Sequence, residues 1–461
     1  MAYNFKECNR EQVYLLPPAL QDWLPSNDLA WLVLDAVAEM NLAAFYLRYR
    51  KDGKGQAAFE PSMMVALLLY SYSIGVRSSR EIEKLCERDI GFRVIAANQK
   101  PDHCTISRFR KENGTALEEL FKQVLKLCKE AGLVKVGIVA LDGSKIKANA
   151  ALEANRTYEH IEREVKKMLA EAEARDAEED RLYGADKRGD ELPDGLADRT
   201  SRRARLAACK KRLEEGAAQA AAEQQSKIEE RQAQEAETGS RKRGRKPKEP
   251  DAAPAADEKA NPTDPDSRIM KTRSGYVQGY NSQAVVTEEQ IIIAAEVTNQ
   301  ENDVNQLHPM IQTAQKNLKA ICAKKKLKIK ISLADAGYAS DKNLAAIRSE
   351  GPEHLIATKK DWKQRKEAAE APSPRGRIPE HLTLRQRMER KLRTKRGREL
   401  YKKRGQTVEA VFGQIKDNRG IRHFMRRGLE ACSQEWKLIC ATHNLLKLWR
   451  SGKGIAAMMT A

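Results

Sequence analysis

The sequence predicts an α/β protein in which a mixed sheet with flanking helices follows an all-helical N-terminal part and is interrupted by a charged helical insertion. Three observations support this prediction. Apolar residues recur at helical spacing over the first 130 residues, β-type runs occur near residue 140 and after residue 275, and the stretch between is rich in Ala, Glu, Lys, Arg and Gln. The predicted parts are residues 1–130, 131–150, 151–275, 276–428 and 429–461, the last of them a C-terminal helix.

Composition limits the class of protein. The 461 residues are 41% hydrophobic, which is enough to bury a core in two or three domains. A net charge of +19 and an isoelectric point near 9.4 indicate a polyanionic partner, nucleic acid before membrane. The sequence shows no membrane-spanning apolar run and no apolar core of a secretion signal, so we expect a cytoplasmic protein. The eight scattered cysteines include no C-x-x-C pair, which predicts reduced thiols and no zinc site.

Residues 1–130 have the spacing and the caps of a helical domain. Helices are expected to begin at Leu29, Pro61, Ser78 and Thr115, with Ser78 and Glu81 spaced as a capping box. Between the last two helices, "PDHCTISRFRKENG" resembles the second helix of a helix-turn-helix, with Arg108 placed to meet DNA. Plain packing of a short helix explains that segment about equally well.

The stretch 151–275 is typical of an insertion rather than a core. Ile161, Val165 and Met168 recur at helical intervals, which predicts an amphipathic helix and allows a helical hairpin. Residues 239–265 have the composition of a linker. Within that linker, "RKRGRKPK" is similar to an AT-hook, in which Arg243 and Arg245 would lie in an A·T minor groove, although a basic linker is at least as good an explanation.

Two β-type runs end in an aspartate. "KVGIVALDGSKIK" stops its apolar stretch at Asp142, and "LKIKISLADAGYAS" does so at Asp335. Between them lie a hairpin with "TEEQ" as its turn and a helix from Asp303; a helix from Ser340 and the strand "HLIAT" follow. A single such Asp is usually a turn or cap residue. Two of them at strand carboxyl ends predict converging carboxylates, which need a cation, and hard oxygen ligands select Mg²⁺ or Mn²⁺.

A third acid is expected from the strongly basic part near the C-terminus. Residues 359–404 hold 18 Lys/Arg and 6 Asp/Glu, a net of +12, which favours phosphate contacts over a merely solvated helix. Glu409 follows on a helix, amid basic and polar residues that are candidates for DNA binding. They are Tyr401, Arg404, Lys416, Arg419 and Arg422. A salt bridge on the surface is the ordinary alternative for Glu409.

These motifs together resemble the bacterial insertion-sequence transposases of the DDE class, along nearly the whole chain. "PSMMVALLLYSYSIGVRSSREIEKLCERDIGFRVIA" and "PDHCTISRFR" are similar to the helical N-terminal domain of that family. "LDGSKIKANA" and "LADAGYAS" look like its two aspartate motifs. Tyr401, Arg404, Glu409 and Lys416 resemble its Tyr-Arg-Glu-Lys signature, with four residues between Arg404 and Glu409 where the family pattern has three.

The resemblance implies a fold and a reaction. The sheet would be the RNase H-like core of retroviral integrases, and Asp142, Asp335 and Glu409 would bind two Mg²⁺ or Mn²⁺ ions. The protein would cleave DNA at the terminal repeats of a mobile element and transfer the freed strand to target DNA, as a homodimer on DNA. Lys416, Tyr401 and Arg404 would position the scissile phosphate, with Lys145 facing DNA. The alternatives are a catalytically silent DNA-binding protein, a scaffold built on the insertion, and an RNase H-like nuclease without strand transfer.

Overall fold

The computed structural model describes residues 19–49, 57–183, 202–241, 247–272, 274–322, 327–347, 351–359, 370 and 372–453. Its N-terminal part is all helical, as the sequence predicts. The elements there are η1 (Leu20–Trp23), α1 (Leu29–Ala38), α2 (Ala43–Tyr46), α3 (Pro61–Ser73), α4 (Ser79–Arg88), α5 (Ile90–Ile95), α6 (His103–Glu112) and α7 (Gly114–Glu130). Helix α3 is the centre of this group, because nearly all of its side chains are buried. The capping box expected at Ser78 is wrong: Ser78 is the N-cap residue of α4, but its side chain makes no capping hydrogen bond.

The sheet contains both parallel and antiparallel pairs. Its strands are β1 (Ile138–Lys147), β4 (Arg268–Thr272), β5 (Gly275–Thr287), β6 (Ile292–Thr298), β7 (Ile331–Ala334) and β8 (Glu353–Ile356). The strand order is β4-β5-β1-β7-β8, and β6 also pairs with β5. Strand β1 is antiparallel to β5 and parallel to β7, and β8 is parallel to β7. The predicted hairpin is confirmed. Strand β4 belongs to the same sheet although it lies before residue 276, where the second part of the sheet domain was expected to begin.

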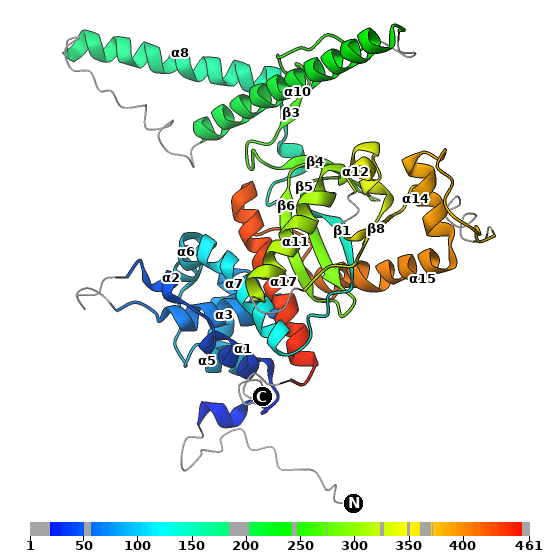
Figure 1. Ribbon diagram of the computed structural model, residues 1–461. Coiled ribbons are helices and arrows are strands. Elements are labelled where there is room, and N and C mark those ends of the chain that lie inside the picture. The colour runs from blue at the N-terminus through cyan, green and yellow to red at the C-terminus, as the bar shows by residue number, and fades with distance from the viewer. Residues whose placement is uncertain are drawn as a thin grey trace, which may run out of the picture.

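Helices cover the sheet and close the chain. They are η3 (Val304–Gln306), α11 (Leu307–Ile321), η4 (Ala336–Tyr338), α12 (Asp341–Ala345), α14 (Leu384–Arg393), α15 (Lys395–Arg404), α16 (Ala410–Gly413) and α17 (Leu429–Arg450), with π-helical turns η5 (Gly405–Glu409) and η6 (Gln414–Asn418) flanking α16. Helices α14 and α15 extend from one side of the sheet (Figure 1). No helix in the described part of the chain is long and apolar enough to cross a membrane.

The insertion leaves the body of the protein as a pair of long helices, α8 (Tyr158–Tyr183) and α10 (Arg202–Thr238) (Figure 1). Their base is held by η2 (Leu152–Ala154) and by the short strands β2 (Arg156–Thr157) and β3 (Lys259–Ala260), which pair with each other. A small separate core lies where the helices meet, and it consists of Ile161, Leu206, Cys209, Leu213 and Ala260. The amphipathic helix predicted from the spacing of Ile161, Val165 and Met168 is therefore confirmed. Arg243 and Arg245 of the AT-hook-like segment lie outside the described residues.

Helix α17 joins the N-terminal helices to the sheet. It packs against α7, α3 and α1 and also against β6, so a single hydrophobic core runs through both regions (Figure 1). Such a helix must be apolar on opposite faces, and Trp436, Ile439 and Leu445 are each completely buried. The C-terminal helix is therefore part of the core.

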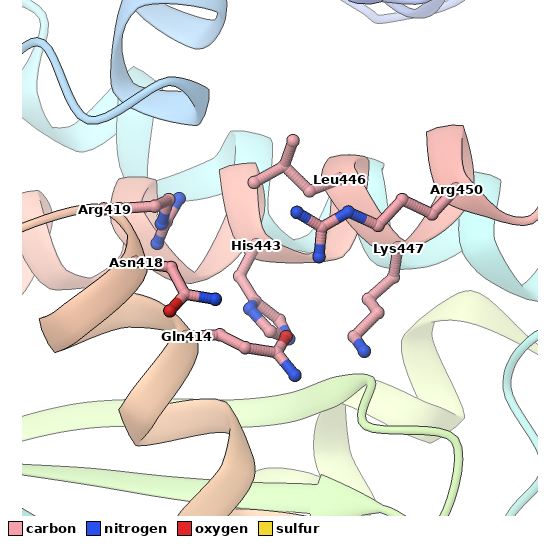
Figure 2. Close-up of a pocket in the computed structure, with 7 residues that line it drawn as sticks. All are labelled: Gln414, Asn418, Arg419, His443, Leu446, Lys447 and Arg450. Carbon is pink, nitrogen blue, oxygen red and sulfur yellow. The ribbon is translucent and has the colours of Figure 1, made fainter.

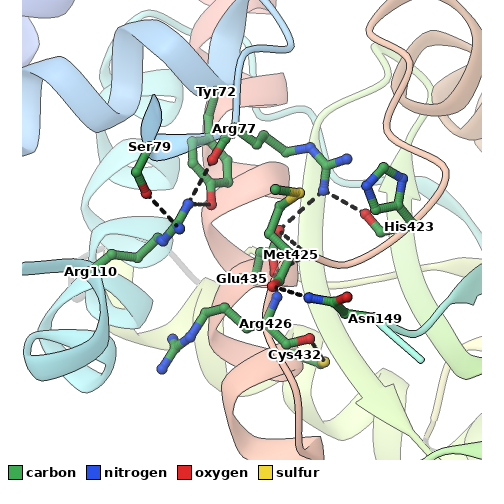
Figure 3. Close-up of polar contacts among 10 residues, drawn as sticks. All are labelled: Tyr72, Arg77, Ser79, Arg110, Asn149, His423, Met425, Arg426, Cys432 and Glu435. Carbon is green, nitrogen blue, oxygen red and sulfur yellow. Dashed lines mark hydrogen bonds and ion pairs between the residues drawn. The ribbon is translucent and has the colours of Figure 1, made fainter. Parts of the chain in front are cut away.

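A buried polar network reinforces this junction (Figure 3). Arg77, from the segment between α3 and α4, lies 3.1 Å from the Glu435 carboxylate on α17, and the two side chains are 5% and 0% exposed. Glu435 also accepts hydrogen bonds from the main-chain N–H groups of Met425 and Arg426. Arg110 on α6 donates to the Tyr72 hydroxyl, the main-chain oxygen of Arg77 and Ser79 Oγ. The network thus fixes the N-terminal helices against the segment that leads into α17.

We predict that Glu435→Ala strongly destabilises the protein. Removing the carboxylate leaves the Arg77 guanidinium buried without its partner, which costs about 3–5 kcal/mol for pairs of this kind. The free energy of unfolding, from chemical denaturation followed by circular dichroism, measures the loss. Glu430→Ala is the matched control, since Glu430 is exposed on the same helix and its removal costs less than about 1 kcal/mol. Equal losses for the two variants would contradict the role of the network.

Candidate active site

Two acids lie on adjacent strands. Asp335 directly follows the end of β7, whereas β1 continues through Asp142 to Lys147, which corrects the expectation that Asp142 ends its strand. Residues 139–141 of β1 are completely buried, and Asp142 follows them with a side chain that is 17% exposed. In the parallel pairing of β1 with β7, Leu141 lies opposite Ala334. The next residue after each of these is an aspartate, so Asp142, within β1, and Asp335, just beyond β7, lie at the same level of the sheet. Asp335 is also the N-cap of η4, where its Oδ1 accepts a hydrogen bond of 2.8 Å from the Gly337 N–H.

A guanidinium group connects Asp142 to Glu409. Arg404, the last residue of α15, donates from Nη2 to Asp142 Oδ2 at 2.6 Å and from Nη1 to Glu409 Oε1 at 2.7 Å. The Arg404 side chain is 10% exposed, whereas that of Glu409 is 58% exposed. The structure therefore places two of the three predicted acids on the same arginine, with the third at the adjoining strand.

The π-helical turn Gly405–Glu409 explains how residues five apart meet at one site. In an α-helix, residues three and four apart share a face. A π-helical turn accommodates one additional residue, and such turns are frequent at functional sites. The four residues between Arg404 and Glu409, one more than the family pattern has, lie within this turn. Arg404 and Glu409 consequently remain on the same side of the helix.

Burial and like charge set the electrostatics of Asp142. Its pKa is raised to about 7, chiefly because burial disfavours the carboxylate; Arg404 opposes the rise, and Asp335 adds to it. Acids brought together in a partly buried site are costly unless a cation neutralises them. Arg404 supplies positive charge between Asp142 and Glu409. The donor set consists of carboxylate oxygens, which suits a hard divalent cation such as Mg²⁺ or Mn²⁺.

Within the described residues, no group of three or more His, Cys, Asp or Glu side chains is arranged to hold a metal ion. The Arg404 guanidinium lies between the carboxylates of Asp142 and Glu409 and forms an ion pair with each. In this conformation the arginine supplies the positive charge that a metal ion would supply at these acids. The residues therefore fit a divalent ion by chemical type.

A fourth acid, Asp303, was missed by the sequence prediction. Its Oδ1 accepts hydrogen bonds from Asn281 Nδ2 at 2.6 Å and from Gln283 Nε2 at 2.7 Å, both on β5. The same oxygen lies 3.6 Å from Lys145 Nζ. Asp303 precedes η3, where the sequence suggested only the start of a helix. A signal was available in the polar Asn281 and Gln283, which alternate along a strand whose side chains are mostly buried.

Two glycines allow Asp303 to approach the strands. A Cβ at Gly143 would come within 2.5 Å of Asp303 Oδ1, so only glycine leaves room for that carboxylate beside β1. A Cβ at Gly337 would lie 2.9 Å from Asp335 Oδ1 and 3.3 Å from Asp303 Oδ2. Asp303 therefore presents one oxygen to the amides and to Lys145, and the other toward Asp335.

Lys145, Lys416 and Tyr401 brace the strands that bear the acids. Lys145 is 17% exposed and faces Asp303, which corrects the expectation that it is turned outward to DNA. Lys416 Nζ donates to the main-chain oxygen of Lys145 at 2.9 Å. The Tyr401 hydroxyl donates to the main-chain oxygen of Ala334 at 3.3 Å, directly before Asp335.

The other predicted DNA-binding residues are not gathered at the acids. Arg422 is exposed and pairs with Asp417 at 2.7 Å, and Arg108 is exposed on α6. Arg419 turns toward α17, where it donates to Thr442 Oγ1 at 2.9 Å and to the main-chain oxygen of Ile439 at 3.1 Å, and it also reaches the main-chain oxygen of Tyr72 on α3 at 3.4 Å.

Two family models match the chain. Residues 236–445 match the family described as Transposase DDE domain, and residues 18–112 match the family described as Transposase domain (DUF772). Asp335 and Glu409 lie inside the first match, whereas Asp142 lies outside both. No curated protein and no solved structure matches the chain. Transposases of the DDE class bind DNA and generally use divalent metal ions, in agreement with the basic composition and the acidic site. The chain therefore belongs to the insertion-sequence transposases of the DDE class.

Proposed function

We propose that this DNA transposase binds the terminal repeats of its mobile element and catalyses DNA cleavage and strand transfer at Asp142, Asp335 and Glu409. One observation carries the proposal: Asp142 on β1 and Asp335 just beyond the end of the adjacent parallel strand β7 lie at the same level of the sheet, and Arg404 connects Asp142 to Glu409. The strand order β6-β5-β1-β7-β8, with two antiparallel pairs and then two parallel pairs, supports an RNase H-like core.

The three acids would hold the divalent ions. When bound, Mg²⁺ or Mn²⁺ activates water or a 3′-hydroxyl and stabilises the leaving oxygen of the phosphodiester. Asp142 must be ionised to serve as a ligand, and the positive charge of Arg404 favours its ionisation. As the acids take up their ions, Arg404 would leave Asp142 and Glu409. Its guanidinium would then be available to a phosphate of the substrate, in keeping with its place in the signature.

The surrounding side chains would keep the acids in place. Asp303 acts as a positioning residue, because it fixes Lys145 and is itself fixed by two amides of β5. Lys416 and Tyr401 hold the main chain beside the two aspartates. The basic helices α14 and α15 would bind the DNA backbone, and two copies of the chain would bring two element ends together. The N-terminal helices would bind the terminal repeats.

The proposal is tested with DNA that carries candidate terminal repeats. We expect Asp142→Asn to lose strand cleavage in the presence of Mg²⁺ while its affinity for the ends remains close to that of the wild type. The amide keeps the shape of the side chain and removes the charged ligand. Asp341→Asn, a change of an exposed acid nearby, should leave cleavage intact. Cleavage by Asp142→Asn would refute the assignment, and cleavage without joined products in the wild type would favour the nuclease alternative.

Asp303→Ala should lower the free energy of unfolding by about 1–3 kcal/mol, because it leaves the buried Lys145 ammonium group without its ion-pair partner and removes one acceptor from each of Asn281 and Gln283. Chemical denaturation measures the loss, and Glu301→Ala is the control, since Glu301 is exposed two residues away. When Lys145 is also replaced by Met, the cost of Asp303→Ala should fall, because no buried ammonium group is then left alone. Simple addition of the two losses would contradict the pairing.

Metal affinity should rise with pH. The pKa of Asp142 is raised to about 7, so a proton competes with the metal ion below that pH. We expect Mn²⁺ binding, measured by calorimetry at pH 6, 7 and 8, to strengthen with each step, and the dependence to weaken in Asp142→Asn. Without a metal ion, the stability of the folded protein depends on pH in the opposite direction. Because the folded pKa lies above the unfolded value of about 3.9, the contribution of Asp142 to stability falls as the pH rises from about 4 to about 7. An affinity independent of pH in the wild type would contradict this account.

A further inference from the structure

A small positively charged pocket lies between the π-helical turn η6 and helix α17 (Figure 2). It is a small hollow that opens to solvent. Seven residues line it, of which three are cationic and none is acidic: Gln414, Asn418, Arg419, His443, Leu446, Lys447 and Arg450. Figure 2 shows side chains from both elements turned toward the same space. The function proposed for the acids makes no use of this pocket.

The positive charge of the pocket is not compensated by nearby acids. Glu288 and Glu289, in the β5–β6 turn, pair with Lys403 and Lys135, respectively. Asp417, on η6 itself, pairs with the exposed Arg422 at 2.7 Å. In the described part of the chain, neither Lys447 nor Arg450 has a carboxylate within salt-bridge distance. Like charges held together in this way repel each other, so the pocket is suited to an anion.

Gln290 holds the pocket in shape. Its side-chain oxygen accepts hydrogen bonds from Gln414 Nε2 at 2.8 Å and from Lys447 Nζ, and its main-chain oxygen accepts one from His443 Nε2 at 3.0 Å. Gln290 has a left-handed backbone with φ of 63°, which is uncommon for a residue other than glycine and is found disproportionately at functional positions. The residue that fixes three lining side chains is therefore itself in a strained conformation.

Arg419 contributes a buried charge with an unused donor. Its two terminal nitrogens donate to Thr442 and to main-chain oxygens, while Nε is buried and has no hydrogen-bond partner. Burial lowers the pKa of Arg419 to about 10, so the group stays charged at neutral pH. His443 adds no charge, because burial lowers its pKa to about 3. The cationic character of the pocket therefore rests on Arg419, Lys447 and Arg450.

We propose that this pocket binds one phosphate group, with Arg450 and Lys447 supplying charge and Asn418 and Gln414 supplying amide donors. The pocket is small and partly open, so it suits a small tetrahedral anion rather than a large organic ligand. The source favoured by the basic chain is a phosphate of the DNA backbone, and in that form the inference rests on the function proposed above. Bound there, DNA would be held on α17 as well as at the acids.

The test measures how DNA affinity depends on salt. Each phosphate contact contributes about −0.9 to the slope of log K against log salt concentration. We expect Lys447→Gln/Arg450→Gln to reduce the magnitude of the slope by about 1 relative to the wild type, with duplex DNA and no metal ion. Lys316→Gln, an exposed lysine on α11, is the control and should leave the slope unchanged. Arg450→Gln alone should reduce the slope in the same direction without disturbing the fold, since Arg450 is exposed and makes no hydrogen bond in the described structure.

A second arm separates the two sources of phosphate. Inorganic phosphate is titrated by calorimetry into the wild type and into Arg450→Gln. If Arg450→Gln loses the binding of inorganic phosphate but keeps the wild-type salt slope for DNA, the pocket binds free phosphate. If the salt slope for DNA is reduced, the pocket binds a phosphate of DNA. Equal slopes and equal phosphate binding in both proteins would overturn the proposal. Because no step requires cleavage, a protein that fails to cut DNA but shows the slope difference would refute the proposed reaction and leave the pocket standing.

Discussion

The contact of Arg404 with Asp142 and Glu409 is the interaction on which the arrangement of this transposase depends. Strands β1 and β7 and the helical turn η5 bring acids into a region where Asp142 is mostly buried, and burial together with Asp335 raises its pKa to about 7. A fold that gathers carboxylates must also provide positive charge. Arg404 provides it from α15, and Lys145 provides it beside Asp303. The acids are thus held together before any ion is bound.

The helical segment from α15 to η6 has to satisfy two requirements at once. It must place Arg404 and Glu409 at the acids, and it must present Gln414 to Gln290 on another side. A regular α-helix would turn Arg404 and Glu409 to different faces, because they are five residues apart. The two π-helical turns, Gly405–Glu409 and Gln414–Asn418, change the period where these contacts are made. The π-helical turn Gly405–Glu409 thus accommodates the additional residue between Arg404 and Glu409, and the two side chains stay on the same side of the helix.

Much of the fold could be predicted because the decisive signals are local. The apolar runs that stop at Asp142 and Asp335 locate β1 and β7, but only β7 ends at its aspartate, because β1 continues to Lys147 by pairing with β5. The hairpin around residues 288–290 and the helices α1, α3 and α7 follow from periodicity in the same way. Asp303 could not be found in this manner, since its partners Lys145 and Gln283 are distant in sequence and only the sheet register brings them together. The side chain of Lys145 was expected to face DNA rather than Asp303 for the same reason.

Positive charge serves different purposes in different parts of this chain, and sequence alone does not separate them. Arg77 and Arg110 are buried and hold the N-terminal helices against α17, so they contribute to the net charge of +19 without facing a ligand. Arg404 neutralises acids. Lys447 and Arg450 differ from these, because no carboxylate offsets them and Gln290 fixes the wall beside them. An anion bound at the pocket on α17 would therefore offset charge that no described carboxylate balances. The density of basic residues along the sequence, which is highest in residues 359–404, does not point to that place.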